Sequence, residues 1–260
     1  MTMARTLAAS VFGAALMVSG MVSGGAFAAG GGAHAPDRDW TFEGIFATFD
    51  RAEVQRGLQV YLEVCANCHG LQYVAYRDLG MIGYDEDQIK AIASEYEVED
   101  GPDNDGEMFM RAARPADRFV SPYPNAKYAA AMNGGAAPPD LSLIYKARAN
   151  GANYLHALLT GFEEEPEEGF EVPDELNYNP YFPGRQIAMA QPLYGEDVEY
   201  ADGTEATIEQ EAHDVTAFLA WAAEPYLERR KSMGLTVVLF VLVLTGLFYA
   251  CKRKIWADLH

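Results

Sequence analysis

Cys65-Ala66-Asn67-Cys68-His69 is the most informative motif in this chain. Two cysteines separated by two residues and followed directly by a histidine are typical of covalent haem attachment. Each thiol can form a thioether with one vinyl group of the porphyrin, and the adjacent histidine can bind the iron as the proximal ligand. The motif therefore predicts one covalently bound haem c on Cys65 and Cys68, with His69 on the metal.

Two other uses of a paired cysteine motif fit the sequence less well. A structural zinc site needs a second Cys/His pair at short spacing, and the only other cysteine, Cys251, lies in a different, apolar environment. A thioredoxin-type redox motif does not need the trailing histidine and expects a βαβ context, which the sequence lacks.

The N-terminus has the three parts of a secretory signal peptide. Arg5 is followed by an apolar stretch from Leu7 to Val22 and then by Ala26-Phe27-Ala28, a small-x-small cleavage site. We expect residues 1–28 to be removed on export. Gly and Ser residues interrupt the stretch, which disfavours the alternative of a permanent anchor helix.

A second apolar run, from Met233 to Cys251, has 19 residues and no charge. As a helix it would be about 28 Å long, close to the ~30 Å hydrocarbon thickness of a bilayer. It has no polar stripe of the kind that a buried soluble helix would show. We expect a transmembrane helix over residues 232–251.

Basic residues flank this helix on both sides, so the positive-inside rule does not orient it. The signal peptide does, because an exported domain followed by a stop-transfer helix leaves the short tail in the cytoplasm. The domains expected from the sequence are a signal peptide (1–28), a periplasmic haem domain (29–231), a transmembrane helix (232–251) and a cytoplasmic tail (252–260).

The exported domain is strongly acidic. Residues 29–231 contain 15 Lys and Arg against 37 Asp and Glu, a formal charge of about −22. Such a field attracts a basic partner, and it excludes nucleic acid, whose phosphates need the opposite charge. The acids concentrate in two polar insertions, Asp85–Glu107 and Glu163–Glu175, which we expect on the surface.

Two helices should frame the haem motif. One begins at Asp50, a good N-cap with Glu53 three positions on, and leads to Cys65; the other begins at the Thr207–Gln210 capping box. Gly57 inside the first helix indicates close packing against another helix, for which the second is the candidate. Only Tyr194–Tyr200 has the pattern of a β-hairpin, so the expected fold is mainly α.

A haem held by one histidine would be open to ligands, and electron carriers close the iron with a second axial ligand, usually methionine. Met189 is one candidate because it lies in a Pro-bounded loop, 181–192, and Met132 beside Asn-Gly-Gly is the other. His156 and His213 lie in helical patterns and are interpreted as ordinary core or surface histidines.

With these features, the chain resembles the bacterial members of the cytochrome c1 family. The matching motifs are spread over most of the exported domain. They are Phe42-Glu-Gly-Ile-Phe, Arg56-Gly-Leu-Gln-Val-Tyr, Pro138-Pro-Asp-Leu-Ser-Leu-Ile, Lys146-Ala-Arg148, Leu158-Leu-Thr-Gly-Phe162, Asn179-Pro-Tyr-Phe-Pro-Gly, Ile187-Ala-Met-Ala, Asp202-Gly-Thr-Glu-Ala-Thr207, Trp221-Ala-Ala-Glu-Pro225 and Arg230-Lys-Ser-Met-Gly-Leu235.

The resemblance implies a c-type cytochrome fold with long insertions, plus one C-terminal transmembrane helix in the bacterial inner membrane. It implies Met189 as the axial ligand, Arg148 as the partner of a haem propionate, and Pro139 packed close to the ring. An arginine suits that role because a partly buried propionate needs a charge-assisted partner.

The function implied is that of the haem subunit of ubiquinol–cytochrome c reductase. Such a subunit passes electrons from a Rieske iron–sulfur centre to a soluble basic cytochrome c, does no bond chemistry of its own, and docks on cytochrome b within the membrane lipid. The rival functions, a membrane-anchored haem sensor or a peroxidase, would need an open sixth site on the iron.

Overall fold

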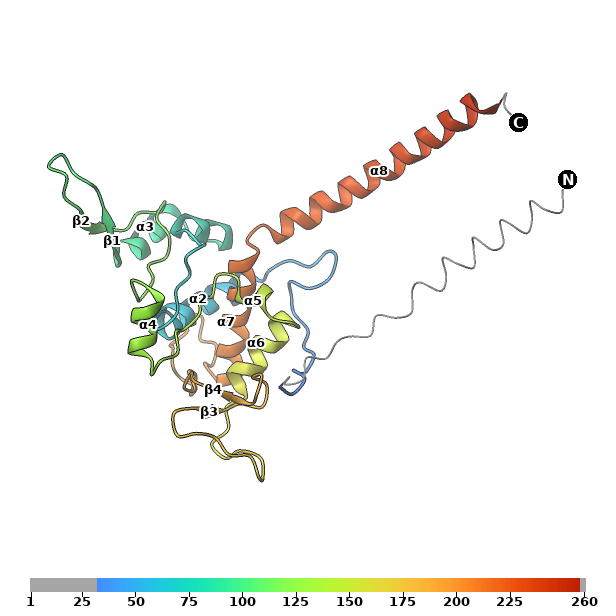
Figure 1. The fold of residues 1–260 in the computed structure, drawn as a ribbon. Coiled ribbons are helices and arrows are strands. Elements are labelled where there is room, and N and C mark those ends of the chain that lie inside the picture. Colours follow the sequence, from blue (N-terminus) through green and yellow to red (C-terminus); the bar gives the residue numbers. More distant parts are fainter. Residues whose placement is uncertain (1–31, 258–260) are drawn as a thin grey trace. The chain divides into compact units, whose positions relative to one another are not determined.

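A computed structural model describes residues 32–257, so the expected signal peptide lies outside the described residues. The elements, shown in Figure 1, are α2 (Arg51–Glu63), η1 (Cys65–Asn67), η2 (Tyr76–Ile82), α3 (Glu86–Ser94), β1 (Glu97–Asp100), β2 (Phe109–Ala112), α4 (Ala126–Met132), α5 (Ile144–Ala147), α6 (Gly151–Thr160), β3 (Asn177–Tyr178), β4 (Gln186–Ile187), α7 (Ile208–Ala223) and α8 (Leu227–Ile255). The expectation of a mainly helical chain is confirmed.

Helix α2 begins where the sequence predicts. The Asp50 carboxylate accepts hydrogen bonds from the backbone N–H groups of Ala52 and Glu53, at 2.9 and 3.3 Å. Glu53 does not complete a capping box, because its side chain turns inward, where Oε1 lies 2.8 Å from Nε2 of His213. The helix ends at Glu63, and a short 3₁₀ turn then carries the first cysteine.

Helix α7 begins at the second predicted cap. Thr207 Oγ1 accepts a hydrogen bond of 3.2 Å from the backbone N–H of Gln210. The Gln210 side chain does not reach back to the cap; it donates to Oδ2 of Asp214, at 3.0 Å. The helix ends at Ala223, two residues before Pro225.

The two helices cross at Gly57, as the sequence predicts. A Cβ atom at Gly57 would overlap the backbone carbonyl of Asp214 and lie 2.7 Å from Cβ of Phe218, so only glycine allows this approach. Next to it, Arg56 donates two hydrogen bonds to the buried Asp214 carboxylate, at 2.8 and 2.9 Å. These contacts join α2 to α7 and fix the direction in which the chain enters the cysteine motif.

The main core lies between these helices. Tyr61 from α2 packs on Phe218 from α7 with ring centroids 5.5 Å apart, and Phe218 packs on Trp221 at 5.7 Å. All three side chains are at most 1% exposed. Figure 1 shows α5 and α6 beside α7, where they complete this helical layer.

The first acidic insertion is on the surface, as expected, and contains more structure than the sequence indicates. It forms α3 and β1, and β1 makes a hairpin with β2, which follows the insertion; Glu97 pairs with Ala112 and Asp100 with Phe109. The hairpin expected around Tyr194–Tyr200 is wrong. There the Asp197 carboxylate accepts hydrogen bonds from the N–H groups of Tyr194 and Gly195, at 2.7 and 3.0 Å, and this local turn replaces strand pairing.

Helix α8 extends beyond the expected span at both ends. Its most apolar stretch has a mean hydropathy of 2.3, and none of that stretch is buried in the described part of the chain. Its first turn is attached to the soluble domain, because Glu228 pairs with Arg51 at 2.8 Å and accepts the N–H of Phe49 at 3.0 Å. The length and exposure of this apolar surface are those of a membrane-spanning helix.

Candidate haem site

The cysteine motif forms a tight turn directly after α2. The backbone N–H groups of Cys68 and His69 both donate to the carbonyl of Cys65, at 3.1 and 2.9 Å. The Asn67 side chain secures the turn by donating to the carbonyls of Glu63 and Val64. Cys65 packs partly against the core whereas Cys68 is exposed, and both thiols are free.

A single hydrogen bond fixes the chemical state of His69. Its Nδ1 lies 2.7 Å from the backbone carbonyl oxygen of Pro139. A carbonyl oxygen only accepts, so Nδ1 carries a proton, and in the neutral ring Nε2 keeps its lone pair. No hydrogen bond joins Nε2 to any residue in the range 32–257. Metal-binding histidines in proteins are typically oriented in this way, with the second ring nitrogen donating to a carbonyl.

Residues 139–142, here called the clamp segment, hold the chain that follows the motif. Leu141 donates its backbone N–H to the carbonyl of Gly70, at 2.9 Å. Asp140 Oδ2 accepts from the N–H of Gln72 at 2.9 Å, and Ser142 Oγ from that of Tyr73 at 3.0 Å. The clamp segment therefore sets the position of the Pro139 carbonyl and, through it, the orientation of the imidazole.

Sequence reasoning missed two residues that act in this arrangement. Tyr61 donates its hydroxyl to the carbonyl of His69, at 3.0 Å. Asp140 folds the clamp segment by accepting the N–H of Ser142 at 3.0 Å. The Asp-x-Ser spacing is a signal for such a turn, but it does not reveal which distant segment the turn contacts.

Burial controls the protonation of the free side chains. It lowers the pKa of His69, while the hydrogen bond to Pro139 and the charge of Asp140 act in the opposite direction. Burial also raises the pKa of the Cys65 thiol to about 12, with a further contribution from Cys68. Before any bond is formed to it, the site presents a neutral imidazole and a protonated Cys65.

The surroundings of the motif fit a large apolar group. Tyr73 and Leu143, on the two hydrogen-bonded segments, are 57% and 46% exposed. These two side chains give the segments next to the motif an exposed apolar character that suits a porphyrin ring. With two free thiols and an available imidazole nitrogen, the residues present suit a covalently attached haem.

The structure places Met189 in a loop, as predicted, directly after β4. Asn177 at the start of β3 holds this loop by donating its side-chain amide to the Met189 carbonyl, at 3.2 Å. The Met189 side chain is partly buried, whereas Met132, at the end of α4, is 62% exposed. Neither methionine makes a hydrogen bond to the cysteine motif within residues 32–257.

Pro139 and Arg148 lie on either side of α5. Pro139 meets His69 directly through its carbonyl. Arg148 lies at the end of α5, is exposed, and donates to the carbonyl of Ala147 at 3.2 Å. It forms no ion pair with an acid in the part of the chain that the structure describes.

His156 is a core histidine and His213 is partly buried, and both fit the interpretation as ordinary core or surface histidines. His213 stacks on Trp40 with ring centroids 4.6 Å apart. His156 is 1% exposed, and burial, followed by the charge of Arg38, lowers its pKa to about 4. Both pack between the N-terminal segment and the helices.

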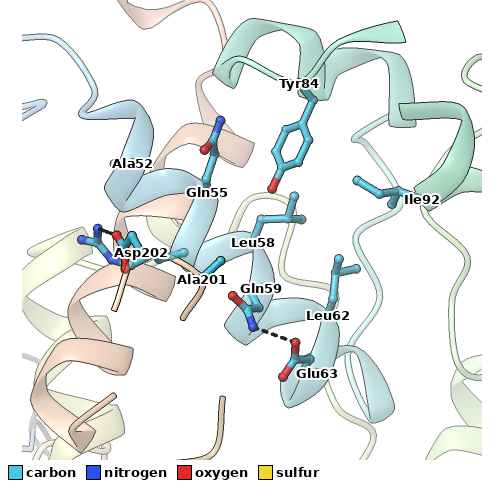
Figure 2. A pocket seen from close by; sticks show the side chains of 11 residues that line it. Ala52, Gln55, Leu58, Gln59, Leu62, Glu63, Tyr84, Ile92, Ala201 and Asp202 are labelled. Atoms are coloured by element: carbon cyan, nitrogen blue, oxygen red, sulfur yellow. Dashed lines mark hydrogen bonds and ion pairs between the residues drawn. The ribbon is translucent and has the colours of Figure 1, made fainter. Parts of the chain in front are cut away.

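A depression of about 380 Å³ lies beside α2, and Cys65, Cys68 and His69 are not among the residues that line it (Figure 2). Several of its polar lining groups already have partners, and the Tyr84 hydroxyl has no hydrogen-bond partner among the described residues. Gln59 pairs with Glu63 at 2.9 Å, and Gln55 donates to the carbonyl of Ile82 at 2.8 Å. Arg56 pairs with Asp202 at 3.0 Å. No residue of the cysteine motif lines the depression, so it is separate from the haem site.

A helical core that carries C-x-x-C-H on a tight turn, with the histidine oriented for a metal, defines the class of c-type cytochromes. Comparison with known protein families identifies the family within this class. The profile of the Cytochrome C1 family matches residues 40–259, and the chain belongs to that family. Members carry one covalently bound haem c and function in electron transport.

Similar proteins come from bacteria and from mitochondria. Cytochrome c1 of Rhodospirillum rubrum is 48% identical, over 94% of this chain and 96% of that protein. The mitochondrial cytochrome c1 heme protein of Schizosaccharomyces pombe is 47% identical, over 88% of this chain and 74% of that one. "Cytochrome b/c1" of Bradyrhizobium diazoefficiens is 48% identical over 86% of this chain, which spans only 36% of that longer protein.

Proposed function

We propose that this chain is the electron-transfer subunit of a quinol–cytochrome c reductase, the cytochrome bc1 complex. It receives electrons from a Rieske iron–sulfur centre and passes them to a soluble cytochrome c. When bound, haem c supplies a one-electron Fe(III)/Fe(II) couple. The observation that carries the proposal is the hydrogen bond between His69 and Pro139, because it leaves one imidazole nitrogen available beside two free thiols.

Within this proposal each residue of the motif has one role. Cys65 and Cys68 hold the haem through thioethers, and Nε2 of His69 is the proximal ligand of the iron. The clamp segment keeps the imidazole in a single tautomer and orientation, which favours a constant ligand field. A carrier benefits from this because electron transfer is fastest when the site does not rearrange.

Met189 is proposed as the second axial ligand. A thioether is soft and raises the reduction potential relative to a second histidine. The Asn177 side chain restrains the loop at Met189 itself, which supports a positioned ligand better than the exposed end of α4 at Met132. This restraint keeps the sixth position closed to small molecules.

Arg148 is proposed to pair with a haem propionate, and Pro139 to pack against the ring. The support for Arg148 is its position shortly after the clamp segment, together with the lack of a carboxylate partner within residues 32–257. Pro139 is supported by its contact with the proximal histidine. A charge-assisted bond to a propionate would compensate for its partial desolvation.

The proposed topology follows from the signal peptide and from the apolar helix α8. Residues 1–28 direct export, residues 29–231 form the periplasmic haem domain, residues 232–251 span the bacterial inner membrane, and residues 252–260 remain in the cytoplasm. The Bradyrhizobium relative is named "Cytochrome b/c1". This supports a cytochrome b partner for the present chain, and the Rieske protein belongs to the same proposal.

Covalent attachment is tested with cysteine variants of the full-length chain expressed in its native membranes. Cys65→Ala and Cys68→Ala should each prevent accumulation of stable holoprotein, since each thiol forms one thioether. Cys251→Ala, at the far end of α8, is the matched control and should keep the haem stain seen after denaturing electrophoresis. Full staining in both motif variants would contradict the assignment.

The partners are tested by purification. The tagged chain, extracted from native membranes in mild detergent, should bring with it a cytochrome b and an iron–sulfur protein. The preparation should reduce soluble cytochrome c with a quinol as donor. A chain that is recovered alone, with no quinol-dependent reduction, would overturn the electron path and leave the haem site intact.

A further inference from the structure

The loop between Trp40 and Phe49 exposes two large apolar side chains. Ile45 is 75% exposed and Phe46 is 79% exposed, the highest values among the exposed large apolar side chains of the described residues. Gly44 has φ of +92°, a left-handed conformation that favours glycine. The turn is therefore built so that a compact tip carries Ile45 and Phe46 away from the core.

The base of this loop is attached to the start of the membrane helix. Lys231 Nζ donates to the carbonyl of Phe42 at 2.7 Å and lies 3.5 Å from that of Ala47. On the same side, Glu228 accepts the N–H of Phe49. In Figure 1 the blue loop before α2 lies beside the start of α8. Both sides of the tip are thus held by residues of the first turns of α8.

The depth of the attachment point follows from helix geometry. Lys231 precedes the charge-free run by only two residues, about 3 Å along the helix axis. The run itself matches the hydrocarbon thickness of ~30 Å, and headgroups extend ~5–8 Å beyond it on each side. A loop held at Lys231 is therefore at the depth of the headgroups.

The residues around the tip suit that layer. Tyr226, at the start of α8, is 58% exposed, and tyrosine is enriched at membrane–water interfaces. Arg229 is exposed on the next turn, where it can meet lipid phosphates, whereas Arg230 pairs with Glu224 at 2.9 Å. Glu43 is the one acid of the tip, and its exposed position before Gly44 allows it to stay in water.

We propose that Ile45 and Phe46 insert into the outer leaflet of the lipid bilayer and form a second membrane attachment beside α8. Two attachment points fix the tilt of the soluble domain, whereas a single helix leaves it free to swing. This inference depends on α8 spanning the membrane and does not depend on the electron path.

The test uses spin labels in the complete assembly. Ile45→Cys and Phe46→Cys are made in a Cys251→Ala background, labelled with a nitroxide, and reconstituted into vesicles of phosphatidylcholine and phosphatidylglycerol. Collisions with O₂, which concentrates in lipid, are compared with collisions with a water-soluble nickel chelate. Each signal is referred to its own nitrogen-equilibrated sample and to the unlabelled background.

Two control positions calibrate the measurement. Tyr194→Cys, 69% exposed on the soluble domain, reports water, and Val243→Cys, 65% exposed within the span, reports lipid. Labels at 45 and 46 should show an O₂-to-nickel ratio several-fold above that at 194, on the side of 243. A ratio equal to that at 194 would place the tip in water and overturn the proposal. Low access to both reagents would place it against a protein subunit and would also overturn it.

Discussion

At the scale of single residues, His69, the proposed proximal ligand, is positioned by a segment seventy residues away in sequence. The carbonyl of Pro139 selects the tautomer of His69, and hydrogen bonds from Gln72 and Tyr73 hold the segment that carries this carbonyl. An imidazole held in this way has little freedom to rotate, so it can bind the iron in either oxidation state with little rearrangement.

Met189→Leu tests the proposed axial ligand. Leucine has a similar volume and no thioether, so the haem should remain covalently attached while the iron becomes high-spin or open to ligands, with a lower reduction potential. The matched control is Met132→Leu, which should leave the optical spectrum unchanged. An unaltered low-spin spectrum in the Met189 variant would move the ligand elsewhere.

A second prediction concerns Glu211, which is fully buried in α7. Burial, together with the neighbouring Asp197, raises its pKa to about 7 from 4.5 in the unfolded chain. Between these two pH values the folded state binds more protons, so the contribution of Glu211 to stability decreases as pH rises from about 4.5 to about 7 and is constant above that.

Unfolding by denaturant, followed for wild type and Glu211→Gln across this range, measures the effect. The difference in unfolding free energy should change with pH in favour of the variant. His156, whose folded pKa of about 4 gives a trend of opposite sign, is present in both proteins and cancels. A difference that does not change with pH would show that the carboxyl titrates normally.

The haem roles of Cys65, Cys68 and His69 are predictions from the sequence, which are possible because the spacing of the motif is local. Cys65, Cys68 and His69 lie within five consecutive residues. Met189 is distinguished as a candidate axial ligand by its Pro-bounded loop. Tyr61, Asp140 and Ser142 could not be predicted in their roles, since a hydrogen bond between segments depends on how the chain folds back. For the same reason the sequence does not show that Pro139 meets His69 through its carbonyl.

At the scale of elements, the crossing of α2 and α7 organises the soluble domain. The two N-caps, Asp50 and Thr207, were predictable because a cap is a local hydrogen bond. The side chains expected to complete each capping box act elsewhere: Glu53 turns to His213 and Gln210 to Asp214. Tertiary partners outcompete the local bond when both are within reach.

Gly57→Ala tests the crossing. The added methyl group collides with the backbone of α7, which cannot move without disturbing the core, so we expect a loss of ~1–3 kcal/mol in unfolding free energy, or failure to accumulate holoprotein. Gly80→Ala is the control, because its Cβ would meet only Ile89 Cδ1, at 3.7 Å. Equal stability of the two variants would contradict the close approach seen at Gly57.

At the scale of the whole molecule, the charge of about −22 on residues 29–231 is the main long-range feature. Both acidic insertions are exposed, as predicted, although some of their acids are already paired. Arg111 in β2 binds both Asp100 and Asp117, and Arg185 binds Glu167 at 2.6 Å. The remaining acids set the field that a basic partner meets.

Reduction of a basic soluble cytochrome c by the complex should therefore slow steeply between low and ~0.15 M ionic strength, where the Debye length is about 8 Å. Steering of this kind changes association rates by tens to a thousandfold. Two matched sets of substitutions locate the acids that produce this steering. Each set replaces five acids with Gln or Asn. One set is Glu95, Glu97, Glu99, Asp105 and Glu107, and the other is Glu163, Glu164, Glu165, Glu168 and Glu171.

Stopped-flow kinetics at several salt concentrations distinguishes the two insertions. The set nearer the acceptor should lower the low-salt rate constant and flatten its dependence on ionic strength, and the other set then serves as the control for a general loss of charge. If neither set alters the rate constant or its salt dependence, steering by these insertions is wrong.

The proposed electron carrier holds a haem that is closed on both sides, by His69 and by Met189. The optical spectrum of the purified full-length protein, recorded with and without carbon monoxide, tests it most directly. We predict a low-spin spectrum, a Met–Fe charge-transfer band in the oxidised form, and no change when carbon monoxide is added to the reduced form. A high-spin spectrum, or a shift on adding carbon monoxide, would contradict the account and indicate a haem sensor or a peroxidase.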